Sequence, residues 1–526
     1  MKSFNFVLLS QLSNLSLRFT RCLNFWRPLL APLLLMLGTA PFALCADKPV
    51  APNIVLILAD DLGYGELGCY GQTKIRTPNI DRLAREGMRF TQHYSGAPVC
   101  APARCTLMTG LHTGHAQIRG NQQAKDAAGK PTEGQYPITA ETLTLAKQLH
   151  NAGYATGAFG KWGLGPVGSS GEPHSQGFDL FFGYNCQAVA HSSYPSHLWR
   201  NAERVPLNAK PIPGHKAQPE GPVRMEDWMA EKYAPAEMLR EAVKFVGEHK
   251  SEPFFLYLPF IEPHVAMQPP PELVETYPAE WDDRPYRGQC GYLPHPRPHA
   301  GYAAMITSLD QHVGTILKTL EEHKLLENTL ILFSSDNGTT HESPGDKVFE
   351  VGGIDGKFFN STAGLRGRKW SVYEGGIRVP LIVRWPGHIA PSSTSDFPCY
   401  FPDHFPTLCE MVGINTPAGL DGISLFPTLT GKGSQAQRNP MLWVFPEYGG
   451  QVAVRIGAFK VLRRNLSRPK QIGGWEVYNL VEDPHETRDL AADKPEIIAQ
   501  AVSLLKREVA ENKVFPLPIP GVSLGE

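Results

Sequence analysis

The sequence predicts an α/β protein: a large mixed, mainly parallel sheet flanked by helices, followed by a small α+β C-terminal domain. Three observations support this prediction. Continuous apolar runs rich in branched residues recur along the 526 residues, as expected for strands covered on both faces. Segments with helical spacing alternate with these runs. From about residue 440 onward the apolar runs become shorter, as in an antiparallel sheet.

The main domain is predicted to span residues 47–440. Its first strand is the apolar run 53–59, and a helix follows over 77–86, with Pro78 in its first turn and Gly87 at its end. Further helices are predicted over 141–150 and about 303–322. The remaining predicted strands are 154–159, 253–261, 329–335 and 379–383.

The C-terminal domain is predicted to span residues 441–526. Its strands are expected at 452–456, 459–462 and 475–480, and an amphipathic helix at 495–511. No internal repeat or low-complexity segment interrupts either domain.

Residues 1–46 have the features of an export signal. Arg18, Arg21 and Arg27 precede an apolar run over 28–37, and small residues near Ala46 offer a cleavage site. A membrane anchor is the alternative, but an apolar run of about ten residues is shorter than the roughly 20 that span a bilayer. We therefore expect a periplasmic or extracellular protein that has no membrane attachment after cleavage.

The composition argues against partners that are bound through charge, nucleic acid and membrane surfaces. A formal net charge of −1 and the lack of a basic tract argue against nucleic acid. Seven cysteines remain after the signal, and the oxidising compartment of an exported protein permits disulfides among them. No CxxC pair or zinc spacing is present.

Oxygen-bearing side chains follow two of the predicted strands. Asp60 and Asp61 end the first strand, and Asp336 and Asn337 end the strand at 329–335. Ligands gather at the carboxyl ends of strands in such sheets, and converging carboxylates require a hard cation between them. Ca²⁺ is the expected ion and Mg²⁺ the second choice. The alternative for a single pair is that Asp60 caps a turn and Asp61 is solvated.

Cys100 lies where a short helix is predicted to begin. Pro102 suits a first helical turn, so the thiol would lie beside free backbone N–H groups and the positive end of the helix dipole, which is an anion site. Taken alone, the segment also fits an ordinary helix start over a buried thiol.

Six motifs together resemble the sulfatase family, in the family's order. They are Asp60 to Gly65, the Cys-x-Pro-x-Arg pattern of Cys100, Pro102 and Arg104, Gly160-Lys161-Trp162, Pro263-His264, Asp336-Asn337-Gly338, and Leu365 to Lys369 ahead of Glu374 to Pro380. The resemblance covers nearly the whole main domain and implies an alkaline-phosphatase-like fold.

The resemblance also implies a mechanism. Cys100 would be oxidised to formylglycine by a maturation enzyme, and one hydroxyl of the hydrated aldehyde, held by the metal, would attack sulfur while the other later expels sulfate. Arg104 would hold this group, Lys161 and Lys369 would bind sulfate oxygens, and His264 would protonate the leaving alcohol. The implied metal ligands are Asp60, Asp61, Asp336, Asn337 and the side chain at 100.

Two positions depart from the family pattern. The family most often has serine where this chain has Ala103, and histidine where it has Gly163. That histidine normally contacts the formylglycine hydroxyl. His115 is a candidate replacement, although the role is not transferred to it.

The expected substrate is a sulfated carbohydrate, galactose-type in our interpretation, or an aryl sulfate. Aromatic rings suit the C–H surfaces of a sugar, and His, Asp and Asn side chains suit its hydroxyl groups. The candidate rim residues are His191, Tyr194, His197, Trp199, His341, Asp355, Phe358, Phe359 and Asn360. Two alternatives stay open: a phosphomonoester or phosphonate monoester hydrolase of the same superfamily, and an inactive glycan-binding homologue.

Overall fold

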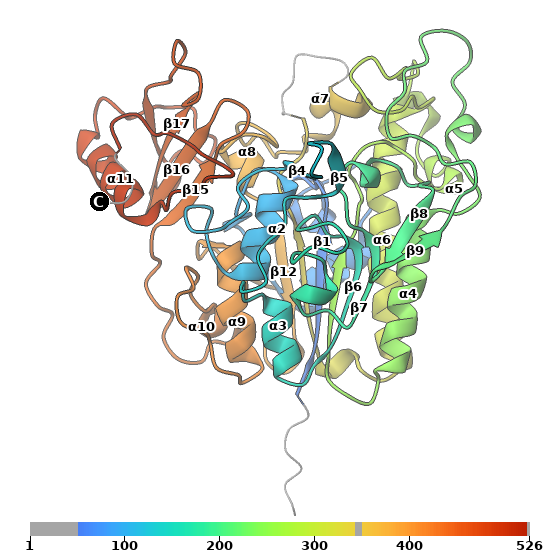
Figure 1. Cartoon of the computed structure of the whole chain (residues 1–526), viewed down its shortest axis with the longest axis horizontal. Helices are drawn as coiled ribbons and strands as arrows, with labels where there is room; N and C mark the ends of the chain where they lie inside the picture. The colour runs from blue at the N-terminus through green and yellow to red at the C-terminus, as the bar shows by residue number, and fades with distance from the viewer. Residues whose placement is uncertain (1–50, 342–349, 523–526) are drawn as a thin grey trace, which may run out of the picture. The chain divides into compact units, whose positions relative to one another are not determined.

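The computed structural model describes residues 51–341 and 350–522, so the predicted signal segment lies outside the described residues (Figure 1). Ten strands form the central sheet. They are β1 (Asn53–Ala59), β2 (Met88–Phe90), β6 (Ala155–Lys161), β7 (Leu180–Tyr184), β8 (His197–Arg200), β9 (Glu203–Pro206), β10 (Phe254–Pro259), β11 (Thr329–Ser335), β12 (Leu381–Arg384) and β13 (Ser393–Ser395).

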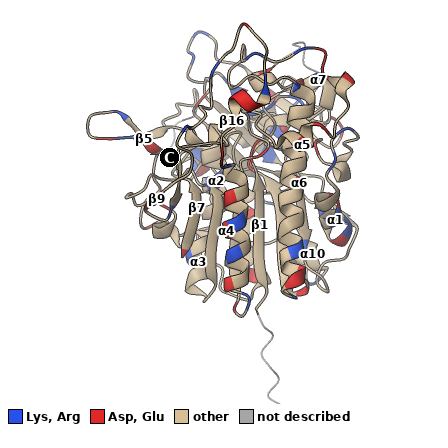
Figure 2. Cartoon of the chain, turned by 90° about the vertical axis from the view of Figure 1, so that its right-hand side faces the viewer, with Lys and Arg blue, Asp and Glu red and all other residues tan. Residues whose placement is uncertain are grey.

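The central sheet is mixed, with a parallel middle. Its order is β13-β2-β12-β11-β1-β10-β6-β7-β8-β9. The strands from β11 to β7 pair in parallel, whereas β12 and β8 join the two ends of this set in antiparallel fashion. The parallel strands end at the top in Figures 1 and 2, where the long loops gather.

Helices cover both faces of this sheet (Figure 1). The helices are α1 (Pro78–Glu86), α2 (Cys100–Thr109), α3 (Leu145–Asn151), α4 (Ala234–Glu248), α5 (Pro271–Val274), α6 (Pro298–Glu322), α7 (Gly356–Phe359), α8 (Glu374–Ile377), α9 (His404–Met411), α10 (Phe426–Thr430) and α11 (Pro495–Glu508). One core joins α1, α4 and α6 to Val55 and Ile57, and the other joins α2, α3 and α9 to Ile54 and Leu56. Residues of β1 are thus buried on alternate faces, which explains its continuous apolar sequence.

The C-terminal part forms a separate four-stranded antiparallel sheet, β15 (Met441–Phe445), β16 (Gln451–Ile456), β17 (Phe459–Arg464) and β18 (Trp475–Asn479). Helix α11 packs on one face. The other face packs against main-domain residues such as Tyr94 and Val372. The predicted fold class is therefore confirmed. Two short pairs complete the strands: β3 (His93–Tyr94) with β14 (Cys399–Tyr400), and β4 (Gln123–Lys125) with β5 (Pro131–Gln135).

A buried charge network fastens the C-terminal sheet to the main domain. Lys460 on β17 lies 3.0 Å from both Glu374, at the start of α8, and Glu486. Tyr94 donates a 2.7 Å hydrogen bond to the other oxygen of Glu374. Because Lys460 is 1% exposed, these two carboxylates, rather than water, stabilise the buried ammonium group.

Several predicted elements differ in their bounds. Helix α3 begins at Leu145 rather than at 141, because the Thr144 side chain accepts a hydrogen bond from the Lys147 N–H and caps the helix there. Helix α6 begins at Pro298, five residues before the predicted start, and α4 lies in a segment where no helix was predicted. None of the seven cysteines of the described residues forms a disulfide in this structure, although the sequence permits such bonds.

Candidate active site

Four neighbouring parallel strands deliver side chains to one point. Asp60 follows β1, Asp336 follows β11, His264 follows β10 by a few residues, and Lys161 is the last residue of β6. Backbone bonds align these ends: Asp336 N–H donates to the Ala59 carbonyl at 2.9 Å and Asp60 N–H to the Glu262 carbonyl at 3.0 Å. This is the edge of an α/β sheet where ligands bind.

Cys100 is the first residue of α2 and points at this edge. Its sulfur lies 3.5 Å from Asp60 Oδ1, 3.5 Å from Lys161 Nζ and 3.3 Å from Lys369 Nζ. The next residue is fixed as well, because Ala101 N–H donates to Asn121 Oδ1 at 2.8 Å. The helix N-terminus and two cations thus surround one side chain.

Two buried lysines face the Cys100 sulfur, and each is paired with a different aspartate. Lys161 Nζ lies 2.5 Å from Asp60 Oδ2, and Lys369 Nζ lies 2.6 Å from Asp61 Oδ1. Burial opposes their charge, but the paired carboxylates outweigh it and raise the pKa of both lysines. Both side chains are therefore cations, as binding of an anion requires.

Arg104, one helical turn beyond Cys100, ties the acidic groups together. Its Nη2 lies 2.7 Å from Asp336 Oδ2 and 3.3 Å from Asp60 Oδ2, and Nη1 donates to the Lys161 carbonyl. The guanidinium is 1% exposed. Its planar fork fixes the two aspartates and the strand end of Lys161 in one geometry.

The acidic cluster fits a bound cation. Ligand atoms of Asp60, Asp61, Cys100 and Asp336 all lie within 4.8 Å of one another. Two buried oxygens there, Asp61 Oδ2 and Asn337 Oδ1, lack a hydrogen-bond partner among the described residues. Burial together with the Asp60 charge raises the pKa of Asp336 to about 6, and burial also raises that of Asp61. A hard divalent ion would use the unpartnered oxygens and relieve this repulsion.

His264 is buried beside the cluster. Its Nδ1 lies 2.5 Å from the Val265 carbonyl, so this nitrogen carries the proton, and Nε2 faces Asp61 Oδ2 at 3.5 Å. Burial, and then the Lys369 charge, lower the pKa of His264 well below its ordinary value. The ring stacks on His191 at a centroid distance of 4.9 Å.

The thiol itself is a poor nucleophile in this setting. Burial, together with the charges of Asp336 and Asp60, raises the pKa of Cys100 far above its ordinary value. The sulfur therefore stays protonated, whereas only a thiolate is strongly nucleophilic. The two ammonium groups beside the sulfur are instead positioned to bind an anionic substrate.

The structure does not bring His115 to this cluster. Its Nδ1 lies 2.9 Å from Asp421 Oδ1, and with His112 and Glu508 it forms a separate group of ligand-type atoms. At Gly163, with φ of 85°, a Cβ atom would lie 2.6 Å from Gln187 Nε2. The space beside Gly163 therefore holds the Gln187 amide.

Of the candidate rim residues, His191 joins the site by stacking on His264. Others make packing contacts instead: Tyr194 packs on Tyr233, and His341 is buried with its Nε2 2.6 Å from Ser361 Oγ. Asp355 caps α7, and Asn360 ends it. Phe358 and Phe359 pack around Trp281, and His197 and Trp199 both contact Glu133.

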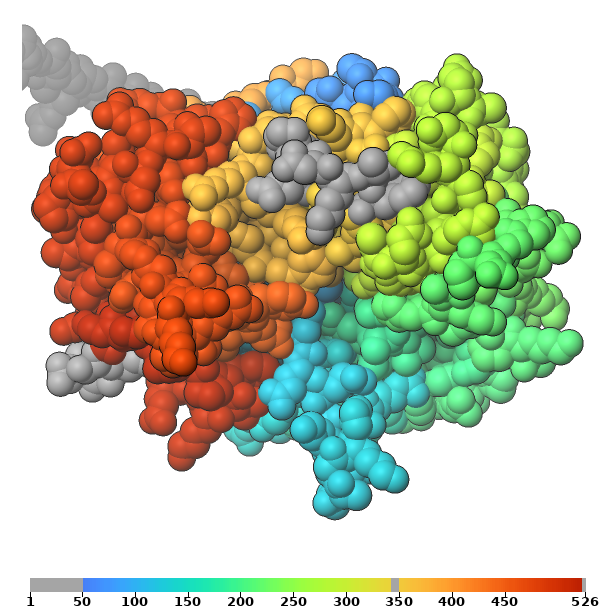
Figure 3. Space-filling view, turned by 90° about the horizontal axis from the view of Figure 1, so that it is seen from above, coloured from blue at the N-terminus to red at the C-terminus, as the bar shows by residue number. Residues whose placement is uncertain are grey.

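Sequence reasoning missed several side chains around the site. Asn121, Tyr292, Trp370 and Tyr448 all lie in irregular segments, where neither period nor strand end marks them. Seen from above, the molecule is hollowed between the β4–β5 hairpin in cyan, the green and gold loops and the orange C-terminal domain (Figure 3).

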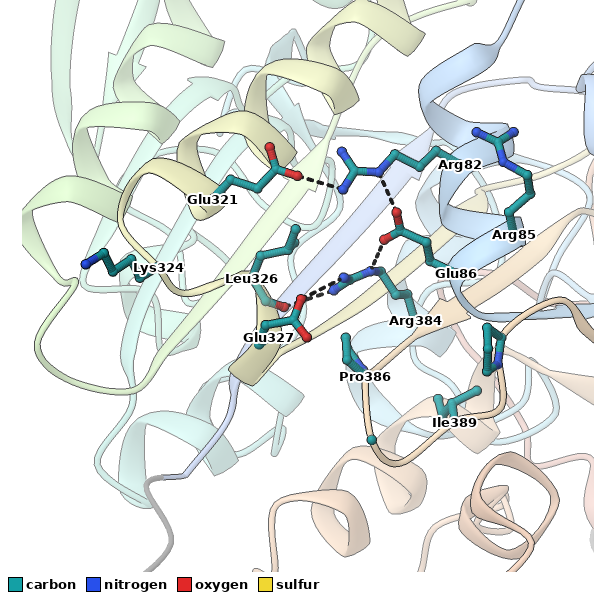
Figure 4. Close-up of a pocket in the computed structure, with 12 residues that line it drawn as sticks. Arg82, Arg85, Glu86, Glu321, Lys324, Leu326, Glu327, Arg384, Pro386 and Ile389 are labelled. Atoms are coloured by element: carbon teal, nitrogen blue, oxygen red, sulfur yellow. Dashed lines mark hydrogen bonds and ion pairs between the residues drawn. The ribbon is translucent and has the colours of Figure 1, made fainter.

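A separate cavity of about 680 Å³ lies between α1, the end of α6 and the loop after β12 (Figure 4). Most of its charged groups pair with one another: Arg82 contacts Glu86 and Glu321, and Arg384 contacts Glu86 and Glu327. None of the lining residues belongs to the Cys100 cluster. Among the described residues no helix has the length and apolar character needed to cross a membrane.

The α/β fold and a cation-lined site at a helix N-terminus define a hydrolase for esters of a tetrahedral oxyanion. A sulfatase family model matches residues 52–414, and one described as N-sulphoglucosamine sulphohydrolase, C-terminal, matches 367–514. The chain thus belongs to the sulfatase family and is a sulfuric ester hydrolase.

Individual proteins agree with this assignment. Human arylsulfatase A is 33% identical over 440 residues, covering 80% of this chain and 76% of that protein. N-acetylgalactosamine-6-O-sulfatase of Bacteroides thetaiotaomicron is 29% identical over 512 residues, covering 86% and 92%. A crystal structure of Ps i-CgsB with k-i-k-neocarrahexaose superimposes with a TM-score of 0.68 at 25% identity, covering 86% and 91%.

Proposed function

We propose that this sulfatase removes sulfate from sulfated carbohydrates, using a formylglycine made from Cys100 and a bound divalent cation. The observation that carries the proposal is the convergence on Cys100 of two buried lysines and an acidic cluster with unpartnered oxygens. The hydrated aldehyde would supply the oxygen nucleophile that a protonated thiol cannot.

The proposed cation is Ca²⁺, with Mg²⁺ as the alternative. Asp60, Asp61, Asp336, Asn337 and the side chain at 100 would hold it, because oxygen donors without histidine favour a hard ion over zinc. When bound, the ion supplies positive charge that lowers the pKa of an oxygen ligand and stabilises charge in the transition state.

The surrounding residues have distinct proposed roles. Lys161 and Lys369 bind the sulfate oxygens, since both ammonium groups lie within 3.5 Å of the Cys100 sulfur. Arg104 holds Asp60 and Asp336 in place through its guanidinium. His264 is the proposed proton donor to the leaving alcohol. Because its Nδ1 proton is engaged by the Val265 carbonyl, Nε2 would first take up a second proton from water, which the negative charge of a bound sulfate ester favours, and then donate it.

A carbohydrate substrate is supported by the relatives and by the shape of the site. The N-acetylgalactosamine-6-O-sulfatase matches nearly the whole chain, and the Ps i-CgsB structure holds a carrageenan-type oligosaccharide. The hollow above the strand ends is open to the surface, as a sugar chain requires (Figure 3).

Export and maturation complete the proposal. Residues 1–46 would direct the chain to the periplasm or the exterior, and a formylglycine-generating enzyme would act on Cys100. The proposed boundary between the main domain and the C-terminal domain lies between residues 440 and 441.

Mass spectrometry of the Cys100 peptide, with protein matured in its own host, tests the formylglycine. The peptide should be lighter by the difference between a thiol and an aldehyde. An intact thiol would favour a glycan-binding protein without catalysis.

Parallel assays on 4-nitrophenyl sulfate and 4-nitrophenyl phosphate test the preference for sulfate. A phosphonate monoester hydrolase shares the fold, with a TM-score of 0.59. Within residues 51–341 and 350–522, the second group of possible metal ligands is His112, His115 and Glu508, and it shares no residue with the Cys100 cluster. The active site would therefore hold a single cation, which favours the sulfate ester because it carries less charge than a phosphate ester. Faster phosphate hydrolysis would contradict this choice.

A further inference from the structure

Tyr448 is an aromatic side chain displayed to solvent. It is 57% exposed, and the other large apolar side chains that reach clear exposure among the described residues are Leu143 and Val481. Tyr448 lies in the turn between β15 and β16. A single exposed apolar side chain is ordinary, so the meaning of this ring depends on how close it lies to the binding site.

The ring is close to the proposed sulfate-binding group. Lys369 Nζ lies 5.8 Å from the Trp370 ring centroid, and the Trp370 and Tyr448 centroids are 5.6 Å apart with an interplanar angle of 32°. Phe445 supports the same ring at 6.0 Å and 20°. Trp370 and Tyr448 therefore lead outward from the Cys100 cluster.

The turn is fastened on both sides. Glu447 Oε1 accepts a 2.9 Å hydrogen bond from Asn121 N–H, and Asn121 in turn caps the helix of Cys100 through Ala101. Gln451 Nε2 donates to the Trp370 carbonyl at 2.7 Å. The turn that carries the Tyr448 ring is thus fixed relative to helix α2, so less conformational entropy is lost when a ligand binds to the ring.

Both aromatic residues have an uncommon backbone conformation. The φ of Trp370 is 73° and that of Tyr448 is 52°, in the left-handed region that bulky residues avoid. Asp61 and Tyr292, which flank the same site, have φ of 65° and 64°. Such conformations persist where surrounding contacts enforce them, and they concentrate at functional sites.

We propose that Tyr448, backed by Trp370, is a stacking platform for the sugar residue attached to the sulfated one. The apolar C–H face of a pyranose fits an aromatic ring. Trp370 is the ring next to Lys369 and Tyr448 is the ring beyond it, so a sugar whose sulfate binds Lys369 would have its neighbouring residue near Tyr448. This inference rests on the proposed carbohydrate function, and it predicts an enzyme for oligosaccharides rather than for monosaccharides alone.

Steady-state kinetics of the mature enzyme test the platform with three substrates: 4-nitrophenyl sulfate, a sulfated monosaccharide and the matching sulfated disaccharide. Tyr448→Ala should raise KM for the disaccharide at least fivefold, with kcat and both smaller substrates within twofold of wild type. Tyr448→Phe keeps the ring and should behave as wild type. Val481→Ala, at a residue that is 71% exposed, is the matched control.

The outcomes separate the two proposals. An unchanged disaccharide KM in Tyr448→Ala, or an equal loss on all three substrates, would overturn the platform while the carbohydrate function stands. A wild-type enzyme that hydrolyses the aryl sulfate but neither sugar would overturn the carbohydrate function, and the platform with it.

Discussion

Replacing Lys460 by methionine should destabilise the protein by removing the cation from a buried network. Methionine keeps most of the side-chain volume, so packing is largely preserved. Glu374 and Glu486, each 3.0 Å from the ammonium group, would be left as buried carboxylates without it. Breaking a buried pair in this way costs about 3–5 kcal/mol of unfolding free energy.

The loss should depend on pH in a defined direction. Burial already raises the pKa of Glu486 to about 7, although Lys460 acts to lower it. Without Lys460 this pKa rises further above its unfolded value, so the carboxyl is tolerated when protonated and becomes more destabilising as pH rises. The deficit of Lys460→Met should therefore be larger at pH 8 than at pH 5.5.

Urea unfolding followed by tryptophan fluorescence at both pH values measures this effect. Lys494→Met is the matched control, because that side chain is 41% exposed and its contact with Glu496 is 4.0 Å. A loss for Lys460→Met below about 1 kcal/mol, or one equal to the control, would refute the reasoning that the network depends on this cation.

Three further changes have defined outcomes. Cys100→Ala should abolish turnover and leave the circular dichroism spectrum unchanged; retained turnover would exclude the formylglycine mechanism. Asp336→Asn removes a charge beside Asp60 and should lose bound Ca²⁺, measured by plasma mass spectrometry, together with activity; an active variant with full metal content would exclude this ligand. His299 gains stability from protonation, since bonds to Asp282 and Asp355 overcome burial and raise its pKa to about 9. That stability is present below pH 6.5 and lost as pH rises through 9, so His299→Gln should lower Tm at pH 6 and much less at pH 9.5, and an equal drop at both would contradict it.

The site residues that could be predicted from sequence follow strand ends or lie in short motifs. Asp60 and Asp336 each come after a continuous apolar run, and parallel strands end at one edge of a sheet, so their convergence was predictable. Their roles as ligands stay a prediction.

The rim was much less predictable, because loop conformation depends on distant contacts. Tyr448 lies beside Trp370 because Glu447 and Gln451 fasten its turn to Asn121 and Trp370, which are far away in the chain. No period or motif marks such a residue. His341, by contrast, was predicted to be a polar rim residue, but it is buried and hydrogen-bonded to Thr339 and Ser361.

The burial of Cys100 has a consequence for the proposed modification. The Cys100 side chain is 1% exposed, and all ten residues of α2 are buried. An enzyme could not reach a side chain buried to this degree in the folded protein. The proposed oxidation of Cys100 would therefore have to precede folding, and a chain that folded first would keep its thiol.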